Sequence, residues 1–540
     1  MENKKKYIFV TGGVCSSLGK GIAASAIGTL LRAAGYHVNM MKIDPYLNLD
    51  AGTMRPYEHG EVYVTDDGTE TDLDLGNYER YVRVRTSRLS SVTTGQVYKQ
   101  VIEAERTGNY LGETVQVIPH ITDEIKRRIR IVDENDQCHI IIVELGGTVG
   151  DIEGIPFIEA IRQFSLEEGR NNVKFVHLTL VPHIAGSGEL KTKPTQHSVK
   201  TLMSMGIQPD FLFCRASTIL PSDLRSKIAL FCNIEEKCIF SAVDVEKSIY
   251  EVPLLFHAQE ADKTILEKMN LPYKNPDLRK WKEIVAIDCE PKNEVKIAFI
   301  GKYIHLGDAY KSVDEALKHA GIANNSRVKV EKIDSEDIEK GLRFIPEDVD
   351  AVLVPGGFGT RGIKGKLKAV GYARTNNIPF FGICLGLQCL IIEFSRNVCN
   401  LSDANSTEFN PETKYPVIEL LSNLKGITKL GGTMRLGSSK TILEKSSKVR
   451  EIYKKGEIHE RHRHRYEVNP EYIGKLTEAG LLISGKADNG LVEIVELPSH
   501  PWFIGVQFHP EFLSAPIDPH PLFASFIAAA LEHKKSRIKK

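Results

Sequence analysis

The chain has 540 residues, of which 42% are hydrophobic and 26% are charged, values that are ordinary for a soluble globular protein. Seventy Lys and Arg residues balance seventy Asp and Glu residues, which argues against a nucleic-acid-binding or membrane-bound protein. The sequence contains no apolar stretch of signal-peptide or membrane-spanning length, and we expect a cytoplasmic location. The nine cysteines form no CxxC pair, which argues against disulfides and zinc.

A glycine-rich stretch at residues 11–21 lies between an apolar run at 7–10 and a helical pattern at 22–32. Strand, glycine-rich turn and helix form the usual setting of a phosphate-binding loop, in which backbone N–H groups and a lysine, here Lys20, hold phosphate oxygens. The spacing departs from the usual pattern, and Gly21 stands where a Ser or Thr normally binds magnesium. If this loop binds a nucleotide, carboxylates from another part of the chain must therefore hold the magnesium ion. A purely structural turn is the alternative.

Two acidic segments could supply these carboxylates. The first is residues 66–76, which include Asp74, and the second is Glu144, at the end of an apolar run. Carboxylates that follow the C-terminal ends of strands in an open α/β sheet lie where ligands bind. We expect Asp74 and Glu144 to hold phosphate-bound magnesium. A solvated acidic turn is the alternative for residues 66–76, whose spacing does not fit a calcium loop.

Two basic segments could also contact a ligand. Lys42 lies at the end of the apolar run 38–43 and could reach a transferring phosphate, or could be an ordinary surface lysine. Residues 191–197 combine cations, hydroxyls and an amide on a loop that Pro194 interrupts. This composition suits an anionic ligand with a polar ring, and an ordinary charged loop is the alternative.

The order of the apolar runs predicts the fold. Strand-like runs alternate with helical stretches at 7–10, 38–43, 139–144, 173–181, 211–215 and 238–243, and a second series occupies 295–301, 351–355, 379–383 and 502–508. This alternation predicts two doubly wound α/β domains. We expect a first domain at residues 1–265, a helical linker at 266–294, a second domain at 295–535 and a basic tail at 536–540.

The second domain contains a candidate nucleophile, Cys384. It lies between an apolar run and a helical pattern, and Gly382 and Gly386 flank it in the cysteine form of a nucleophile elbow. The start of the helix favours a thiolate, the N–H of Leu385 can donate to an oxyanion, and Gly357 can supply a second donor. A buried structural cysteine is the alternative.

A base and a residue that orients it follow a later apolar run. His509 and Glu511 are two residues apart, so their side chains share a face in an extended chain. The basic run at 459–467 contains Arg465, which could bind an α-carboxylate at the edge of a polar pocket. Metal or nucleic-acid binding by that run is the alternative.

Five motifs together, at residues 12–21, 70–76, 144–153, 191–196 and 461–467, make the chain resemble the CTP synthase family from about residue 3 to residue 535. The resemblance implies an N-terminal P-loop amidoligase (synthase) domain of dethiobiotin-synthetase-like fold. It also implies a C-terminal flavodoxin-like class I glutamine amidotransferase domain. The unusual spacing of the phosphate loop is normal in this family.

The resemblance implies a reaction in which ATP phosphorylates O4 of UTP and ammonia from glutamine then displaces phosphate at C4 to give CTP. It further implies Mg²⁺ as cofactor, CTP as feedback inhibitor, GTP as allosteric activator, and a homotetramer. Because ammonia in neutral water is mostly ammonium, which has no free electron pair, we expect a protected channel between the two domains.

The resemblance also assigns site residues by position. The residues that match ATP contacts are Ser17, Leu18, Gly19, Lys20, Gly21, Ile22, Asp74, Val243, Asp244 and Val245, with Lys20 and Lys42 at the transferring phosphate and Asp74 and Glu144 as magnesium ligands. Those that match UTP or CTP contacts are Ser16, Asp151, Ile152, Glu153, Lys191, Thr192, Lys193, Pro194, Thr195, Gln196 and Lys227. In the second domain, the triad is Cys384, His509 and Glu511, the glutamine contacts are Gly357, Leu385, Gly386, Leu387, Gln388, Glu408 and Arg465, and Arg361 is a candidate GTP contact.

Two other hypotheses remain open. An amidoligase with the same two domains could act on a cofactor carboxylate, but such an enzyme would not need the segments at 151–153 and 191–196. An ATP-switched scaffold with a degenerate glutaminase would be expected to lose the nucleophile, which this sequence retains.

Overall fold

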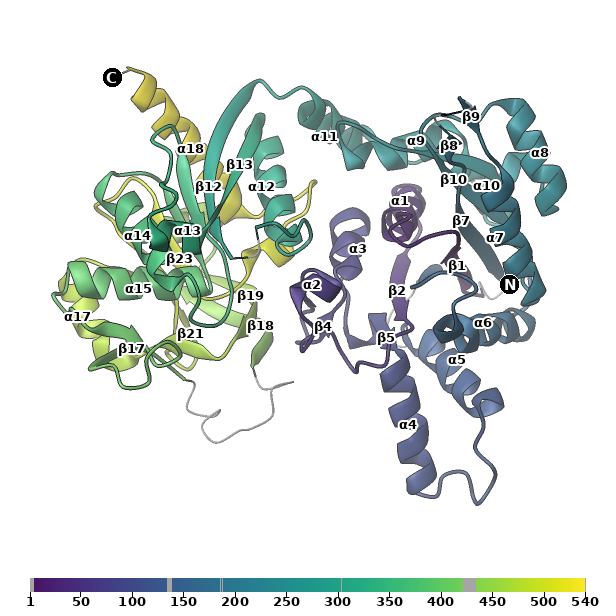
Figure 1. Cartoon of the computed structure of the whole chain (residues 1–540), viewed down its shortest axis with the longest axis horizontal. Coiled ribbons are helices and arrows are strands. Elements are labelled where there is room, and N and C mark those ends of the chain that lie inside the picture. The colour runs from purple at the N-terminus through teal and green to yellow at the C-terminus, as the bar shows by residue number, and fades with distance from the viewer. Residues whose placement is uncertain are drawn as a thin grey trace. The chain divides into compact units, whose positions relative to one another are not determined.

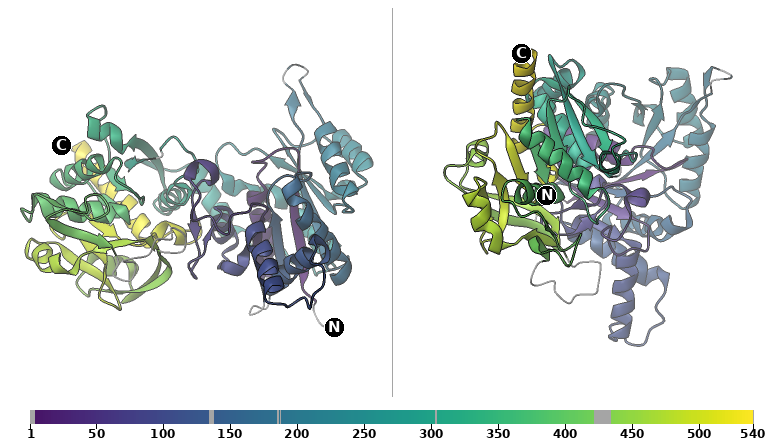
Figure 2. Two further views of the ribbon diagram at one scale, coloured as in Figure 1. Left: turned by 60° about the horizontal axis from the view of Figure 1, so that its bottom comes forward. Right: turned by 60° about the vertical axis from the view of Figure 1, so that its left-hand side comes forward.

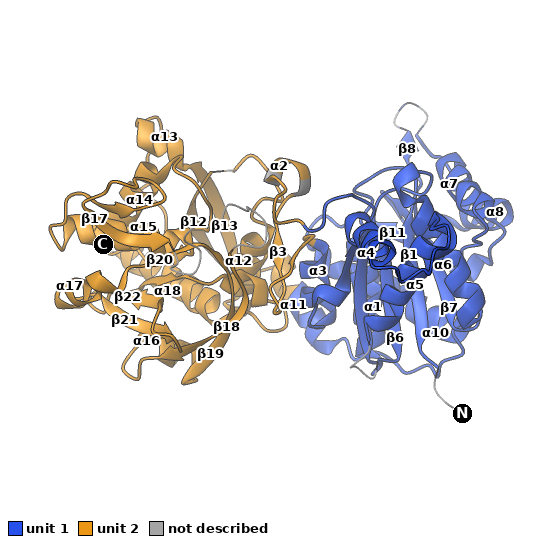
Figure 3. Ribbon diagram, turned by 90° about the horizontal axis from the view of Figure 1, so that it is seen from below, with its two compact units in different colours: residues 1–50, 74–285 blue, residues 51–73, 286–540 orange. Residues whose placement is uncertain are grey.

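The computed structural model describes residues 4–133, 138–184, 186, 188–302, 304–420 and 434–539, and the chain divides into two compact units (Figure 3). Unit 1 comprises Met1–Asp50 and Asp74–Val285, and unit 2 comprises Ala51–Leu73 and Ala286–Lys540. Residues 51–73 therefore differ from the expected division, which placed them in the first domain, because their side chains bond to residues of unit 2, as described below.

Unit 1 is built on a seven-stranded sheet in which every neighbouring pair of strands is parallel. Its strands are, in spatial order, β11 (Ile239–Val243), β10 (Phe211–Ala216), β7 (Val173–Leu180), β1 (Lys6–Gly12), β6 (Ile140–Leu145), β2 (Val38–Asp44) and β5 (Ser91–Thr93). Helices cover both faces, so the central strands are buried throughout and read as continuous apolar runs. The apolar runs predicted in this part of the sequence coincide with these strands.

The helices of unit 1 connect successive strands. They are α1 (Lys20–Ala33), α3 (Asp74–Val82), α4 (Thr94–Arg106), α5 (Thr122–Ile131), α6 (Ile155–Glu168), α7 (Lys193–Ser204), α8 (Ser222–Cys232), α9 (Val252–Ala258) and α10 (Ala261–Lys268). Apolar residues of α4, α5 and α6 form one core with one face of the sheet, and α1 packs on the other face beside α3 and α9. Helix α4 and the chain that follows it extend beyond the end of the sheet (Figure 1; Figure 2).

Unit 2 contains a nine-stranded mixed sheet. Its order is β13 (Ser326–Asp334), β12 (Asn293–Gly301), β14 (Ala351–Val354), β15 (Phe380–Ile383), β23 (Phe503–Val506), β22 (Val492–Glu496), β21 (Leu482–Ala487), β18 (Arg435–Leu443) and β19 (Glu457–His464). The first five strands run parallel, and four of them match the predicted runs, whereas the edge strand β13 was not predicted. Each strand from β22 onward pairs antiparallel with its neighbour. The antiparallel half was not predicted, since its strands carry many charged residues and lack long apolar runs.

Two cores, one on each face of the parallel half, stabilise unit 2. Val352 points into a core with α14 (Ile363–Thr375) and α15 (Leu385–Asn397), and Leu353 points into a core with α12 (Lys311–Ala323) and α18 (Pro521–Lys539). The side chains of a strand alternate between faces, so one apolar strand supplies both cores. The remaining helices of unit 2 are α2 (Pro56–His59), α13 (Ser335–Lys340), α16 (Lys448–Tyr453) and α17 (Ile473–Glu478).

The expected linker and tail are helical. Helix α11 (Arg279–Cys289) lies within the range 266–294, where the sequence predicted a helical linker, and includes the boundary between the units. Residues 536–539 continue α18 and do not form a separate tail, and Lys540 lies outside the described residues. In the described part of the chain, none of the helices has both the length and the apolar character needed to cross a bilayer.

Candidate active sites

The phosphate loop joins β1 to α1. Val14, Ser17 and Gly19 have positive φ angles of 80°, 57° and 92°, a sequence of turns that brings the backbone round to the first residue of α1, Lys20. The Lys20 ammonium donates to the carbonyl of Gly147 at 2.7 Å, and burial lowers the pKa of Lys20. The loop therefore places a partly desolvated cation at the N-terminus of α1, where a helix favours an anion.

The absence of a Ser or Thr at position 21 has a steric cause. A Cβ atom on Gly21 would lie 2.2 Å from Oδ1 of Asp74, which is too close for two atoms that are not bonded to each other. Asp74 begins α3, and its carboxylate thus occupies the space that a side chain at position 21 would need.

The two predicted magnesium ligands face a lysine from a neighbouring strand. The ammonium of Lys42 lies 2.7 Å from Oδ2 of Asp74 and 3.1 Å from Oδ1 of Asp44. Glu144 is buried and accepts a hydrogen bond of 2.5 Å from the hydroxyl of Tyr78. Burial and the negative charge of Asp74 raise the pKa of Glu144 to about 8.

This donor set fits a magnesium ion. Two carboxylates with coupled charges gain stability from a divalent cation, which takes a few protein oxygens and completes its shell with phosphate and water. Among the described residues, no group of three or more His, Cys, Asp or Glu side chains could hold a metal ion alone. A site that shares its ion with substrate phosphates is consistent with that finding.

The other nucleotide residues predicted in unit 1 follow the C-terminal ends of its parallel strands. Residues 191–196 include the first turn of α7, where the Gln196 amide donates to the hydroxyl of Thr192 at 3.0 Å. Asp151 accepts from the backbone N–H of Thr148 at 3.1 Å, and Ile152 is 80% exposed. Lys227 lies on α8, which packs against α7. The sheet thus places these segments at one edge.

Arg215 is a contact that sequence reasoning missed. It lies near the end of β10, donates to the carbonyl of Ser17 at 3.1 Å and pairs with Asp244 at 2.8 Å. It therefore joins the phosphate loop to the segment at 243–245 that matches an adenine contact. A charged residue near the end of an otherwise apolar strand was the available signal.

In unit 2, Cys384 stands between β15 and α15 with φ 51° and ψ −101°, a conformation that L-residues rarely adopt. A Cβ on Gly382 would lie 2.7 Å from the backbone of Gly386, and a Cβ on Gly386 would lie 2.1 Å from the carbonyl oxygen of Val354. The two flanking glycines are therefore required by space, as expected for a nucleophile elbow.

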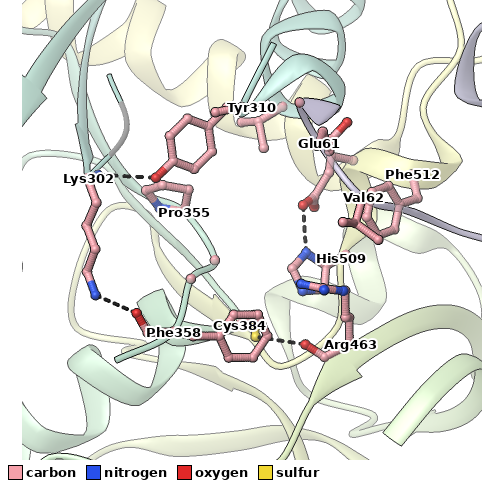
Figure 4. A pocket seen from close by; sticks show the side chains of 16 residues that line it. Glu61, Val62, Lys302, Tyr310, Pro355, Phe358, Cys384, Arg463, His509 and Phe512 are labelled. Carbon is pink, nitrogen blue, oxygen red and sulfur yellow. Dashed lines mark hydrogen bonds and ion pairs between the residues drawn. The ribbon is translucent and has the colours of Figure 1, made fainter. Parts of the chain in front are cut away.

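Parallel pairing brings the base to the nucleophile. Strands β15 and β23 are neighbours, with Ile383 opposite Val506, so Cys384 and His509 leave the sheet at the same edge. A Cβ atom on Gly356 would lie 2.8 Å from Cε1 of His509 and 3.7 Å from Cβ of Cys384, so both side chains meet at this glycine. Figure 4 shows Cys384 and His509 lining one pocket, together with Tyr310, Phe358 and Arg463.

Glu511 holds the imidazole of His509 in place. Its Oε1 lies 2.7 Å from Nδ1 of His509, which leaves Nε2 free to exchange a proton. Burial alone would lower the pKa of His509, but the negative charges of Glu511 and Cys384 raise it to about 10. The arrangement favours an imidazolium at His509.

The loop at 355–359 is held by two charged residues. The Lys302 ammonium donates to the carbonyls of Phe358 and Gly359 at 2.7 and 2.8 Å, and Glu408 accepts from the N–H of Gly359 at 2.7 Å. The Arg463 guanidinium stacks 5.1 Å from the centre of the Phe358 ring. Sequence reasoning missed Lys302 and Arg463, because their partners are distant in the chain.

The predicted glutamine contacts occupy different positions around this loop. Gly357 lines the pocket, whereas Leu387 lies in the apolar core and could contact a ligand only through its backbone. The Gln388 amide donates to the carbonyl of Tyr466 at 3.0 Å, next to Arg465. Arg361, the candidate GTP contact, is 53% exposed at its side chain and pairs with Glu336 at 2.9 Å.

Residues 51–73 pack beside the pocket that contains Cys384 and His509. Gly60, Glu61 and Val62 line it, and the hydroxyl of Ser312 donates to Glu61 at 2.5 Å. The edge strand β19 supplies further bonds through its alternate arginines: Arg461, fully buried, pairs with Asp66 at 2.6 Å, and Arg463 pairs with Glu70 at 2.8 Å. These bonds explain why the segment belongs to unit 2. They also favour the pocket-lining interpretation of residues 459–467 over metal binding.

A phosphate-loop unit joined to a unit with an elbow cysteine, a histidine and a glutamate defines the class of glutamine-dependent ligases. The family model described as CTP synthase N-terminus matches residues 6–271, and the model described as glutamine amidotransferase class-I matches residues 305–529. The chain belongs to the CTP synthase family. It is 56% identical to the CTP synthase of Geobacter sulfurreducens over 99% of this chain and 100% of the relative.

Other relatives are similar over the same extent. The CTP synthase of Aquifex aeolicus is 55% identical, over 98% of this chain and 99% of the relative. Among solved structures, the glutaminase domain of Trypanosoma brucei CTPS with bound acivicin is 44% identical, over 44% of this chain and 94% of the solved chain, with a TM-score of 0.41.

Proposed function

We propose that this protein converts UTP to CTP with ATP and glutamine, that unit 1 carries the synthase reaction and that Cys384, His509 and Glu511 of unit 2 hydrolyse glutamine. The observation that carries this proposal is the meeting of Cys384 and the His509–Glu511 pair at Gly356, in a chain that matches CTP synthases over its whole length. An intact nucleophile site argues against the scaffold hypothesis.

In unit 1, O4 of UTP attacks the γ-phosphorus of ATP, and ADP leaves. Lys20 and Lys42 neutralise the charge that develops on the transferring phosphoryl group, because both ammonium groups lie at the end of the sheet beside Asp74. Asp74 and Glu144 hold Mg²⁺, which when bound screens the phosphate charge. Ammonia then adds to C4, phosphate leaves with O4, and the loss of one proton from N3 and one from the added nitrogen gives CTP.

In unit 2, the Cys384 thiolate attacks the amide carbon of glutamine, and the N–H groups of Leu385 and Gly357 stabilise the oxyanion. His509 donates its proton to the departing nitrogen, so ammonia leaves and a thioester remains. His509 then takes a proton from water, which hydrolyses the thioester to glutamate. Glu511 keeps the imidazole oriented and charged. Arg465 and Glu408 bind the amino-acid end of glutamine.

Nucleotide recognition follows from the remaining segments. Residues 17–22 and 243–245 bind ATP, and UTP is bound by Ser16, Lys191–Gln196 and Lys227. Residues 151–153 bind the ring of CTP as feedback inhibitor. GTP activates glutamine hydrolysis through a site that includes Arg361. The protein acts as a cytoplasmic homotetramer, and ammonia moves from unit 2 to unit 1 without release to solvent.

The first test measures CTP formation by Cys384→Ala with either glutamine or an ammonium salt. We expect a loss of about 1,000-fold or more with glutamine, since the nucleophile is removed, and normal activity with ammonium. Cys399→Ala, at the end of α15, is the control and should resemble the wild type with both nitrogen sources. Loss of activity with both sources in a folded Cys384→Ala protein would contradict the two-site proposal. A wild type that makes no CTP would favour an amidoligase that acts on a carboxylate.

A further inference from the structure

Three buried polar side chains connect the phosphate loop of unit 1 to helix α7. Nδ1 of His177, on β7, lies 2.8 Å from the hydroxyl of Thr11, and Nε2 lies 2.7 Å from the hydroxyl of Ser198. Thr11 and His177 are fully buried, and Ser198 is 7% exposed. Thr11 is the strand residue that precedes Gly12 and Gly13 of the loop, and Ser198 lies in the second turn of α7. The mechanism above uses none of the three.

The direction of each hydrogen bond follows from the bond between the Thr11 hydroxyl and the backbone of β7. The Thr11 hydroxyl donates to the carbonyl of Val176 at 3.3 Å, so it accepts from Nδ1–H of His177. Nε2 must then accept from the Ser198 hydroxyl. Burial and the nearby Lys20 lower the pKa of His177 to about 3, which keeps the ring neutral and this tautomer in place. A neutral imidazole is well suited to this position, since it has one donor and one acceptor on opposite sides.

The chain of bonds runs where the loop and α7 are closest. A Cβ on Gly13 would lie 1.7 Å from the Ser198 hydroxyl and 3.2 Å from Nε2 of His177, so only glycine fits. A second bond on the same face joins α7 to β7, because the Thr195 hydroxyl donates to the hydroxyl of Thr179 at 3.1 Å. That second bond holds the helix on the strand but does not reach the loop. Only the link through His177 connects α7 to the residue that precedes the phosphate loop.

We propose that His177, with Thr11 and Ser198, is a positioning residue for phosphoryl transfer, because it holds the ATP loop in a fixed place relative to the first turn of α7. This inference rests on the proposed function, in which the loop binds ATP and Lys191–Gln196 bind UTP. In-line transfer requires O4 of UTP to approach the γ-phosphorus at about 3–3.5 Å, and a misplacement of about 1 Å slows the reaction strongly. The distance between the two segments therefore affects the rate. The backbone pairing of β1 with β7 sets Thr11 opposite His177, and the side-chain hydrogen bonds of His177 add a direct link from that position to α7.

The test measures ammonium-dependent CTP synthesis, with separate kcat and KM values for ATP and UTP. His177→Phe keeps a planar ring without hydrogen bonds, and Thr11→Val removes the hydroxyl with little change of shape. We expect each change to lower kcat by about 10- to 100-fold, while the KM values of both nucleotides change much less. Thr11→Ser, which keeps the hydroxyl, should restore most of kcat.

Thr179→Val is the matched control, since it removes the buried hydrogen bond from Thr195 of the same helix, together with a 3.6 Å contact to Sγ of Cys214, without reaching the loop. Thr195 keeps its bond to the carbonyl of Leu180. The control variant should leave kcat near the wild-type value. Glutamine hydrolysis and thermal unfolding report whether each variant is folded. Wild-type kcat in folded His177→Phe and Thr11→Val proteins would overturn the proposal, as would an effect confined to the KM of one nucleotide or equal loss in Thr11→Ser and Thr11→Val. A wild type that makes no CTP would refute the function itself, and with it this proposal.

Discussion

At the scale of single residues, the candidate sites are defined by glycines that leave room for a neighbouring group. Gly21 makes room for the Asp74 carboxylate, Gly356 for the His509 imidazole and Gly386 for the carbonyl of Val354. Each close approach places a charged or reactive group where the chemistry needs it. Replacing these glycines should therefore affect function more than their small size suggests.

Gly386→Ala tests this point at the elbow. The added methyl group would meet the Val354 carbonyl oxygen at 2.1 Å, which should destabilise unit 2 by about 1–3 kcal/mol or more and displace Cys384. Urea unfolding and glutamine hydrolysis measure the two effects. Gly474→Ala is the control, because that helical glycine has open space around its Cβ position and should tolerate alanine without loss. Equal stability of the two variants would contradict the steric argument.

Glu511→Gln tests the electrostatic role of the carboxylate. The negative charge of Glu511 helps to raise the pKa of His509 to about 10, so the imidazolium should persist up to that pH in the wild type. The alkaline limb of kcat/KM for glutamine hydrolysis should therefore lie near pH 10 and move to lower pH in Glu511→Gln, with an overall loss of about 100-fold or more. Glutamate release across the pH range measures both. An unchanged alkaline limb would show that the charge does not act on His509.

At the scale of elements, the segment at 51–73 and the edge strand β19 form one assembly within unit 2. Alternate arginines of β19 pair with acidic residues of the segment, and the segment lines the pocket that contains Cys384. The segment is continuous in the chain with Asp50 on one side and the proposed magnesium ligand Asp74 on the other. It is thus the part of unit 2 best placed by connectivity to link the two reactions.

Glu70→Gln should weaken that link. Loss of the charge opposite Arg463 should cost about 1–2 kcal/mol in unit 2 and loosen the segment. We expect the ratio of glutamate released to CTP formed to rise, while ammonium-dependent synthesis changes little. Assays of glutamate and CTP in one reaction measure the ratio. Glu58→Gln, an exposed acid in the same segment, should leave it unchanged, and an unchanged ratio in Glu70→Gln would refute the coupling role.

At the scale of the whole molecule, the proposal places two reactions in one chain and has ammonia pass between them. We therefore expect that a molecule without glutamine hydrolysis cannot readily use the ammonia that a second molecule releases. Unprotonated ammonia released into neutral solution is quickly diluted and becomes ammonium.

An equimolar mixture of Cys384→Ala and Asp74→Asn tests this prediction. The first variant should lack glutamine hydrolysis and the second CTP synthesis from either nitrogen source. With glutamine, ATP, UTP and GTP, the mixture should form CTP only after a lag, while ammonia accumulates in solution. A time course of CTP formation measures the lag, and adding ammonium salt should abolish it. Immediate CTP formation at the wild-type rate would contradict transfer within one molecule.

The sequence by itself determined the parallel strands, the phosphate loop and the nucleophile elbow. Each depends on neighbours within about ten residues, such as the apolar runs and the glycines around Lys20 and Cys384, and local steric rules act directly on such patterns. The order of the strands came from the tertiary structure, which also added β5 and β13, two strands that the apolar runs had not indicated.

The tertiary structure decided the pairings between residues that are distant in the chain. For the run that contains Arg461 and Arg463, the sequence left a pocket edge and a metal or nucleic-acid site open. The structure supplied their partners Asp66 and Glu70, almost 400 residues away. The same holds for Arg215, Lys302 and His177, whose roles depend on which groups face them across the fold. Ion pairs and buried hydrogen bonds are set by three-dimensional proximity, and a linear sequence contains each partner without indicating that the two will meet.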